Sequence, residues 1–208
     1  MFKSNILKSV LLAVVISVFT SCTKDDETSS TTSELATKTY ANLYAPQTGG
    51  GGQPSGGVFT KFSFSQNAIV TDDSWDIAFR GTTILVNGGS SVGISDEPTR
   101  TGIAAVSIVN NTFNLIKTIP DTSTFKQDGA NTYAIPIGSG NGWYVYESST
   151  NLVNPIAGKV FVIKTHDGKY AKLEIMSYYK DGNAIPNSLE GAKYFTFKYA
   201  YQPEGTNF

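Results

Sequence analysis

The chain of 208 residues carries 16 Lys and Arg against 17 Asp and Glu, a formal net charge of −1. Proteins that bind nucleic acid normally show a basic excess or a basic patch, so this balance excludes a nucleic-acid partner. Hydrophobic residues make up 40% of the chain and aromatic residues 12%, enough for one domain with a packed core. The single Cys and single His exclude a disulfide framework and a zinc site of the usual kind.

The N-terminus has the layout of a secretory signal. Lys3 and Lys8 give a basic start, a mostly apolar run follows over residues 9–19, and small residues precede Cys22. This apolar run is too short for an ordinary membrane-spanning helix, which needs roughly 20 residues. The sequence therefore predicts that residues 1–21 form a signal peptide that is cleaved before Cys22.

The placement of Cys22 resembles that in bacterial lipoprotein signals. The resemblance implies a diacylglyceryl thioether on the sulfur and an acyl group, such as palmitate, on the new amine. Several acyl chains hold a protein stably at a membrane, whereas a single chain is marginal. We therefore expect a lipid anchor in the outer membrane.

An acidic run follows the cysteine directly, as Lys24, Asp25, Asp26 and Glu27. It resembles the signal that sends lipoproteins of the Bacteroidota to the cell surface, which implies a protein facing the cell exterior. The alternative is a periplasm-facing anchor, with these residues as the start of a solvated tether. Residues 22–37 are rich in Ser and Thr with almost no apolar side chains, so we expect a flexible tether there.

Residues 38–208 then form the predicted domain. Aromatic and β-branched runs separated by Gly and Asn turns are typical of strands, and no segment shows a convincing amphipathic helix. Residues 123–142 are predicted to be irregular or to contain short strands. These patterns predict a single antiparallel all-β domain. The segments with strand character are residues 58–64, 75–79, 82–86, 103–109, 143–147, 159–164, 169–178 and 194–199.

Alternation within the first strands predicts which side chains share a face. Phe62 and Phe64 fall on one face of their strand. Trp75, Ile77 and Phe79 fall together on one face of the next.

Three connections carry clear signals. Residues 49–57 are rich in Gly and predict a flexible loop, and this loop lacks the lysine of a phosphate-binding loop. Asn87-Gly88 is a strong tight-turn signal. Asp167-Gly168 predicts a hairpin turn between residues 159–164 and 169–178, because Gly readily takes a positive φ.

The returning strand of that hairpin has two distinct faces. Ala171, Leu173 and Ile175 form the apolar face. The opposite, more polar face is predicted to carry Lys172, Glu174, Met176 and Tyr178.

The polar residues do not assemble into recognisable catalytic machinery. His166 lies at the predicted hairpin tip, where we favour a solvated turn residue over a catalytic one. The acidic stretch from Asp72 to Asp76 could hold a hard cation, but an Asp-capped turn is the favoured interpretation. The chain shows no activated nucleophile and no acid–base pair, so we expect it not to be an enzyme.

Tyrosines provide the clearest candidate for ligand binding. Tyr144, Tyr146, Tyr178 and Tyr179 are predicted near polar faces, where aromatic rings can form a platform for a porphyrin or a sugar ring. Ordinary cross-strand packing of the rings is the alternative.

Several segments together resemble the HmuY family, haem-binding lipoproteins of the Bacteroidota with an all-β fold. The resemblance implies iron acquisition, in which haem or a related tetrapyrrole is bound and passed to a TonB-dependent receptor. It rests on Trp75-Asp76-Ile77-Ala78-Phe79, the run into Asn87-Gly88-Gly89, Gly142-Trp143, residues 160–164, residues 167–173 and the strand 194–199.

The iron ligands of the family do not carry over. The resemblance implies two His or Met ligands, near Ser148 and within residues 114–118, and neither place offers either residue type. Haem would then be held by apolar and aromatic contact or by one off-pattern donor, such as Tyr146 or Met176. We therefore predict Tyr144, Tyr146 and Met176 as ligand-binding residues. A binder of glycans or other small ligands, or a structural or adhesive surface domain, stays open as an alternative.

Cys22→Ser should abolish acylation and release the protein from the membrane fraction, because its sulfur is the predicted lipid attachment point. Mass spectrometry of the N-terminal peptide and membrane fractionation of cells measure both effects.

A second variant with Asp25, Asp26 and Glu27 changed to Ala separates the two orientations. Surface export predicts that this variant stays in the membrane but becomes inaccessible to protease added to intact cells. Unchanged protease accessibility would favour the plain tether.

Overall fold

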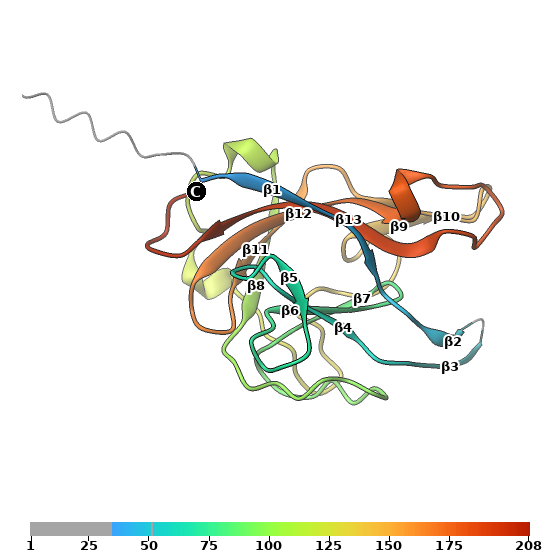
Figure 1. Cartoon of the computed structure of the whole chain (residues 1–208), viewed down its shortest axis with the longest axis horizontal. Helices are drawn as coiled ribbons and strands as arrows, with labels where there is room; N and C mark the ends of the chain where they lie inside the picture. Colours follow the sequence, from blue (N-terminus) through green and yellow to red (C-terminus); the bar gives the residue numbers. More distant parts are fainter. Residues whose placement is uncertain (1–34, 51) are drawn as a thin grey trace, which may run out of the picture. The chain divides into compact units, whose positions relative to one another are not determined.

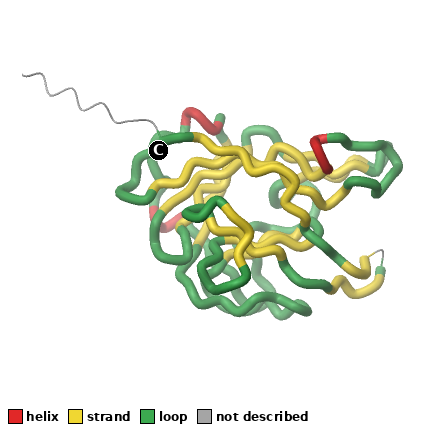
Figure 2. Tube along the Cα trace, viewed as in Figure 1, coloured by secondary structure: helices red, strands yellow, loops and turns green. Residues whose placement is uncertain are grey.

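The computed structural model describes residues 35–50 and 52–208, so the predicted signal peptide, Cys22 and the acidic run lie outside the described residues. The described part consists mainly of antiparallel strands (Figures 1 and 2), which confirms the all-β prediction. No helix among these residues is long and apolar enough to cross a membrane. Helical structure in this part is limited to three 3-10 turns, η1 (Phe113–Leu115), η2 (Thr122–Thr124) and η3 (Lys180–Gly182).

The larger sheet has five antiparallel strands in the order β1-β13-β12-β11-β8. The predicted hairpin around Asp167-Gly168 forms its centre, with Phe161 opposite Leu173. The strands are β1 (Thr37–Tyr44), β8 (Ala105–Asn110), β11 (Lys159–Lys164), β12 (Tyr170–Tyr179) and β13 (Ala192–Gln202).

The second sheet has four antiparallel strands in the order β5-β4-β6-β7. Its bounds are β4 (Thr60–Ser63), β5 (Ala68–Val70), β6 (Ile77–Arg80) and β7 (Thr83–Val86). Two short hairpins complete the described strands, formed by β2 (Thr48–Gly50) with β3 (Gln53–Gly56) and by β9 (Tyr144–Glu147) with β10 (Leu152–Pro155).

The main core lies between the two larger sheets and is dominated by aromatic rings. Phe62 of β4 meets Phe197 of β13 edge to face, with ring centroids 5.2 Å apart. Phe79 of β6 lies 4.8 Å from Phe195 of β13. Such pairs add about 0.5–1.5 kcal/mol beyond the area they bury. The ring contacts therefore join the sheets face to face.

The outer faces of both sheets are also covered. A cluster that includes Trp75, Leu85 and Val92 lies on the outer side of the four-stranded sheet. On the outer side of the five-stranded sheet, Lys172 is buried and its Nζ donates to the backbone oxygens of Phe113 and Ile116, at 3.1 and 2.8 Å. The face of β12 predicted to be polar is therefore buried at Lys172, because the segment around η1 packs over it.

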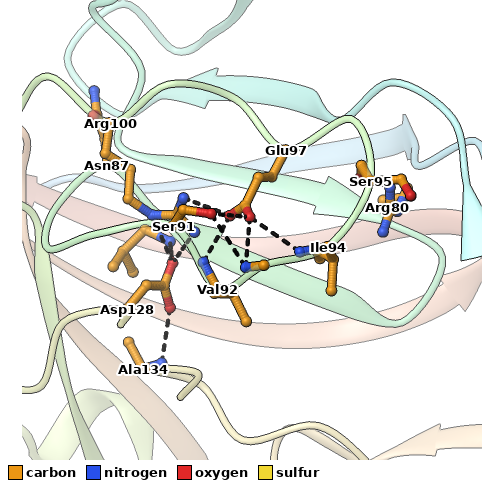
Figure 3. Close-up of polar contacts among 12 residues, drawn as sticks. Arg80, Asn87, Ser91, Val92, Ile94, Ser95, Glu97, Arg100, Asp128 and Ala134 are labelled. Atoms are coloured by element: carbon orange, nitrogen blue, oxygen red, sulfur yellow. Dashed lines mark hydrogen bonds and ion pairs between the residues drawn. The ribbon is translucent and has the colours of Figure 1, made fainter. Parts of the chain in front are cut away.

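A buried carboxylate network fastens the loop between β7 and β8 (Figure 3). Glu97 accepts hydrogen bonds from Ser91 Oγ at 2.5 Å and from the backbone N–H groups of residues 92–94. Arg100 joins Glu97 at 2.7 Å to Asp128 at 2.9 Å, and the side chains of Arg100 and Asp128 are almost completely buried. Asp128 in turn accepts from the backbone N–H of Val86 at 2.9 Å. We call Glu97, Arg100 and Asp128 the carboxylate clasp.

Two predicted features of the first strands are wrong. Trp75 does not share a face with Ile77 and Phe79, because the chain bends at Asp76 before β6 begins and Trp75 packs in the outer cluster. The Gly-rich residues 49–57 are not only a loop, since β2 and β3 pair there in an antiparallel hairpin.

Asn87-Gly88 likewise does not form the predicted tight hairpin turn. The buried Asn87 side chain accepts from the backbone N–H of Thr101 at 2.8 Å and donates to the backbone oxygen of Trp75 at 2.8 Å. Gly88 is required because a Cβ there would lie 2.0 Å from the backbone oxygen of Ala104. The motif thus joins three segments by close backbone approach.

The Glu97→Gln variant should lose less stability than the wild-type protein when the pH is lowered. Burial alone would raise the pKa of Glu97, but the bonds from Ser91, the loop N–H groups and Arg100 outweigh it and lower the pKa from 4.5 to about 2. The carboxylate therefore stabilises the fold fully above pH 4.5, and this contribution is lost as the pH falls toward 2. A pKa lowered this far adds at most about 3 kcal/mol to the free energy of unfolding at neutral pH, and solvent screening at the partly exposed carboxylate reduces that figure.

The measurement is urea unfolding of both proteins from neutral to acid pH. The stability difference between wild type and Glu97→Gln should shrink as the pH falls through this window. Glu204→Gln, at an exposed position, is the matched control. Parallel stability curves for wild type and Glu97→Gln would contradict the assignment.

Candidate functional site

A groove of about 590 Å³ opens between the β9–β10 hairpin and the adjoining ends of β1, β12 and β13. This volume falls in the range of about 300–1,000 Å³ that is usual for small-ligand sites. We call it the hairpin groove. Its lining consists of Ala41, Asn42, Val153, Asn154, Pro155, Met176, Ser177, Tyr178, Tyr179, Asp181, Gly182, Ala184 and Thr196.

Met176 lies in this groove at the point where the pairing of β12 with β13 slips by one residue. The register with β13 shifts between Ile175 and Ser177, which breaks the alternation at Met176. Ser177 Oγ accepts from the backbone N–H of Tyr179 at 3.0 Å and helps to hold the irregular backbone. Met176 keeps the outward face that regular alternation after Ile175 gives it and is 51% exposed, while Ile175 belongs to the core. The groove lining therefore includes an exposed thioether beside a strand irregularity.

The same slip turns Tyr178 into the core, so its predicted place on a polar face is wrong. Its ring lies 5.5 Å from that of Trp143 and 5.2 Å from that of Phe195. Burial, with the nearby Tyr179 and Tyr144, raises the pKa of Tyr178, so its hydroxyl stays protonated. Tyr179 is buried as well, which also contradicts its predicted place near a polar face.

Trp143 fixes the start of the hairpin that forms one wall of the groove. Its Nε1 donates to the backbone oxygen of Thr82 at 2.8 Å. Gly142 permits this position, because a Cβ there would lie 1.9 Å from the backbone oxygen of Pro136. The Gly-Trp pair therefore anchors the hairpin to the four-stranded sheet.

The hairpin also bonds directly to β12 and to the following loop. The Tyr179 hydroxyl accepts from the backbone N–H of Val153 at 2.8 Å. Asn187 N–H donates to the backbone oxygen of Thr150 at 2.7 Å, and Asn151 Nδ2 donates to the Asn187 side chain at 2.8 Å. These contacts fix the position of the hairpin relative to β12 and to the loop that follows it.

The other predicted ligand residues lie on this hairpin but not in the lining. Tyr144 is half-buried with its ring 4.8 Å from that of Trp143. Tyr146 is 44% exposed, and its hydroxyl bonds to Asn151. Their cross-strand partners, Pro155 and Val153, do line the groove. Ligand binding by Tyr144, Tyr146 and Met176 stays a prediction.

Most of the described domain matches one known protein family. The family model described as HmuY protein matches residues 57–199. The chain belongs to the HmuY family. The match covers the four-stranded sheet, the carboxylate clasp and most of the larger sheet and hairpin groove, but it begins after β1. No curated protein sequence matches the chain.

The chain is also similar to solved structures of bacterial proteins, at low sequence identity. An apo HmuY analog of Tannerella forsythia is 13% identical with a TM-score of 0.48, over 82% of this chain and 96% of that chain. A predicted HmuY-like haem-binding protein of Bacteroides vulgatus is 14% identical with a TM-score of 0.44, over 82% and 93%. A predicted lipoprotein of Bacteroides fragilis is 15% identical with a TM-score of 0.44, over 71% and 86%.

The two places where the family resemblance implies iron ligands lie on different parts of this HmuY-family domain. Residues 114–118 belong to or follow η1, whose segment packs over Lys172 in the first half of β12. Ser148 lies in the turn of the β9–β10 hairpin, which adjoins the second half of β12 at the groove. The hairpin groove instead offers Met176.

His166 is bound to the four-stranded sheet rather than freely solvated, so that expectation is wrong. Its Nδ1 lies 2.7 Å from Asp76 Oδ1, which also accepts the His166 backbone N–H at 2.9 Å. Asp76 Oδ2 accepts the backbone N–H of Phe64 at 2.8 Å. Burial raises the pKa of Asp76, and the bonds from His166 oppose this shift. The pair joins the two sheets.

Asp167 brings a third candidate metal ligand within 4.8 Å of this pair. Its Oδ1 accepts from Thr165 Oγ1 at 2.6 Å, and both oxygens of Asp76 already accept hydrogen bonds from backbone N–H groups. Earlier in the chain, Asp72 Oδ1 accepts from both the N–H and the hydroxyl of Ser74, as in an Asp-capped turn. These acidic groups are accounted for by protein contacts.

Tyr179→Phe should loosen the hairpin, because it removes the hydroxyl that accepts the Val153 N–H. A single lost hydrogen bond of this kind costs about 1 kcal/mol. Amide hydrogen exchange across β9 and β10 should accelerate by about fivefold. Tyr170→Phe, at the other end of β12, is the control, and equal exchange in both variants would rule out this attachment.

Proposed function

We propose that this HmuY-family protein is a lipid-anchored carrier at the outer membrane that binds haem or a related tetrapyrrole in the hairpin groove. It passes the ligand to a TonB-dependent receptor as a step in iron acquisition. Family membership supports the ligand class, and the lipoprotein-like N-terminus supports the location. The protein acts by binding and release, not as an enzyme.

The observation that carries this proposal is the exposed Met176 within the groove. A thioether is a soft donor that ligates haem iron in proteins, and apolar and aromatic walls suit the macrocycle. Val153, Pro155 and Ala184 give the lining an apolar part beside this sulfur. One thioether without a second His or Met is a weaker ligand set than a pair.

A glycan is the second candidate ligand. Asn42, Asn154 and Asp181 in the lining can hydrogen-bond to sugar hydroxyls, beside apolar contacts suited to a ring face. The same anchor would serve a carrier of sugars. A glycan array probed with the purified protein tests this candidate.

Met176→Leu should weaken hemin binding about tenfold, or about 1.4 kcal/mol, because it removes the proposed axial donor while keeping similar volume. Hemin titration of the purified full-length protein in detergent, followed at the Soret band in both oxidation states, measures the affinity. Iron-free protoporphyrin should bind wild type and variant equally.

Ile69→Leu provides the control, since Ile69 is an exposed apolar residue on β5, outside the groove lining. Absence of any Soret shift with wild type would overturn haem binding. Equal hemin affinity and spectra in wild type and Met176→Leu would overturn the role of Met176.

A further inference from the structure

The lining of the hairpin groove carries one charged side chain, and its charge is negative. None of its lining residues is Lys, Arg or His, and the only charged residue among them is Asp181. The groove therefore offers no cation to neutralise an anionic group of a ligand. Haem has two propionate groups on one edge of an otherwise apolar ring, so the placement of this charge bears on how haem can enter.

The position of Asp181 is fixed by reciprocal bonds with Asn42. Asn42 Nδ2 donates to Asp181 Oδ1 at 2.7 Å, and the Asp181 backbone N–H donates to Asn42 Oδ1 at 2.8 Å. Both residues have positive φ, 60° and 55°, a conformation that Asn and Asp tolerate better than other side chains. These bonds cross from β1 to η3 and hold the carboxylate beside the groove.

The nearest cation in sequence is Lys180, which does not line the groove. Its backbone N–H donates to the Gly191 oxygen at 2.8 Å, and its Cβ lies close to Gly191. The Lys180 backbone is thus held against the loop that leads into β13, and Lys180 itself is exposed. A propionate placed inside the groove would face the Asp181 carboxylate and would lose water without gaining an ion pair.

We propose that the hairpin groove takes the uncharged edge of a tetrapyrrole and leaves both propionates in water, with Asp181 selecting against ligands that present a carboxylate inward. This inference rests on the proposed function and adds the orientation and charge preference of the ligand.

The size of the effect is modest because Asp181 is exposed to solvent. At separations of several ångströms in a water-like dielectric, one unit charge changes affinity for an anion by about threefold. Added salt screens such an interaction. The effect of Asp181 should therefore be largest at low ionic strength.

The test compares hemin with its dimethyl ester, in which both propionates are neutral, on the purified full-length protein. The ester should bind at least as tightly as hemin. Asp181→Asn keeps the oxygen that accepts from Asn42 and should tighten hemin binding about threefold at low salt, with no change for the ester. Thermal unfolding of the variant checks that the fold is intact.

Asp73→Asn is the matched control, because Asp73 is an exposed acid outside the groove lining, and it should change neither affinity. Ester binding weaker than hemin binding, or hemin binding weakened by Lys180→Gln, would show that a cation holds the propionates and would overturn the inference alone. Failure of both porphyrins to bind would overturn the proposed function along with it.

Discussion

The layer of aromatic rings between the two large sheets is the constraint on which the rest of this structure depends. Rings from β4 and β6 meet rings from β13, and each sheet buries its inner face only because the other supplies these contacts. Trp143 extends the layer, with its ring 4.9 Å from that of Phe195. Because β9 begins at the next residue, the aromatic layer also fixes where the hairpin leaves the sheets.

The shape of the hairpin groove depends on how the side chains of β12 pack against the aromatic layer. Leu173 and Ile175 face the core by regular alternation, and Tyr178 faces it only because the register slips beyond Ile175. The slip makes room for a large ring against Trp143, while Met176 stays on the outward face that regular alternation gives it. The packing requirement and the candidate ligand residue therefore share one backbone irregularity.

Alternation and turn chemistry predicted the regular parts of the fold from the sequence. The β11–β12 hairpin and the inner faces of β4 and β13 follow from short-range patterns of apolar residues, which need no knowledge of the partner strand. The edge strand β1 and the short strand β10 carry mixed polar residues with weak alternation. Whether these segments form strands therefore depends on the strands with which they pair. The slip at Met176 and the burial of Lys172 depend on contacts with distant segments, which no local pattern encodes.

The environment of His166 also depends on a contact with a distant segment, and that contact bears on which residue could ligate iron. A turn between two strands predicts exposure, but Asp76 enters from the other sheet and engages the imidazole, so the only histidine of the chain contributes to joining the sheets. The iron of a bound haem would then depend on a single thioether at the groove. A single weak donor favours faster dissociation than a pair of ligands, and differences in affinity between related complexes arise mostly in the dissociation rate. In the proposed carrier, a ligand held this weakly and with its propionates in water would present its charged edge to a receptor first.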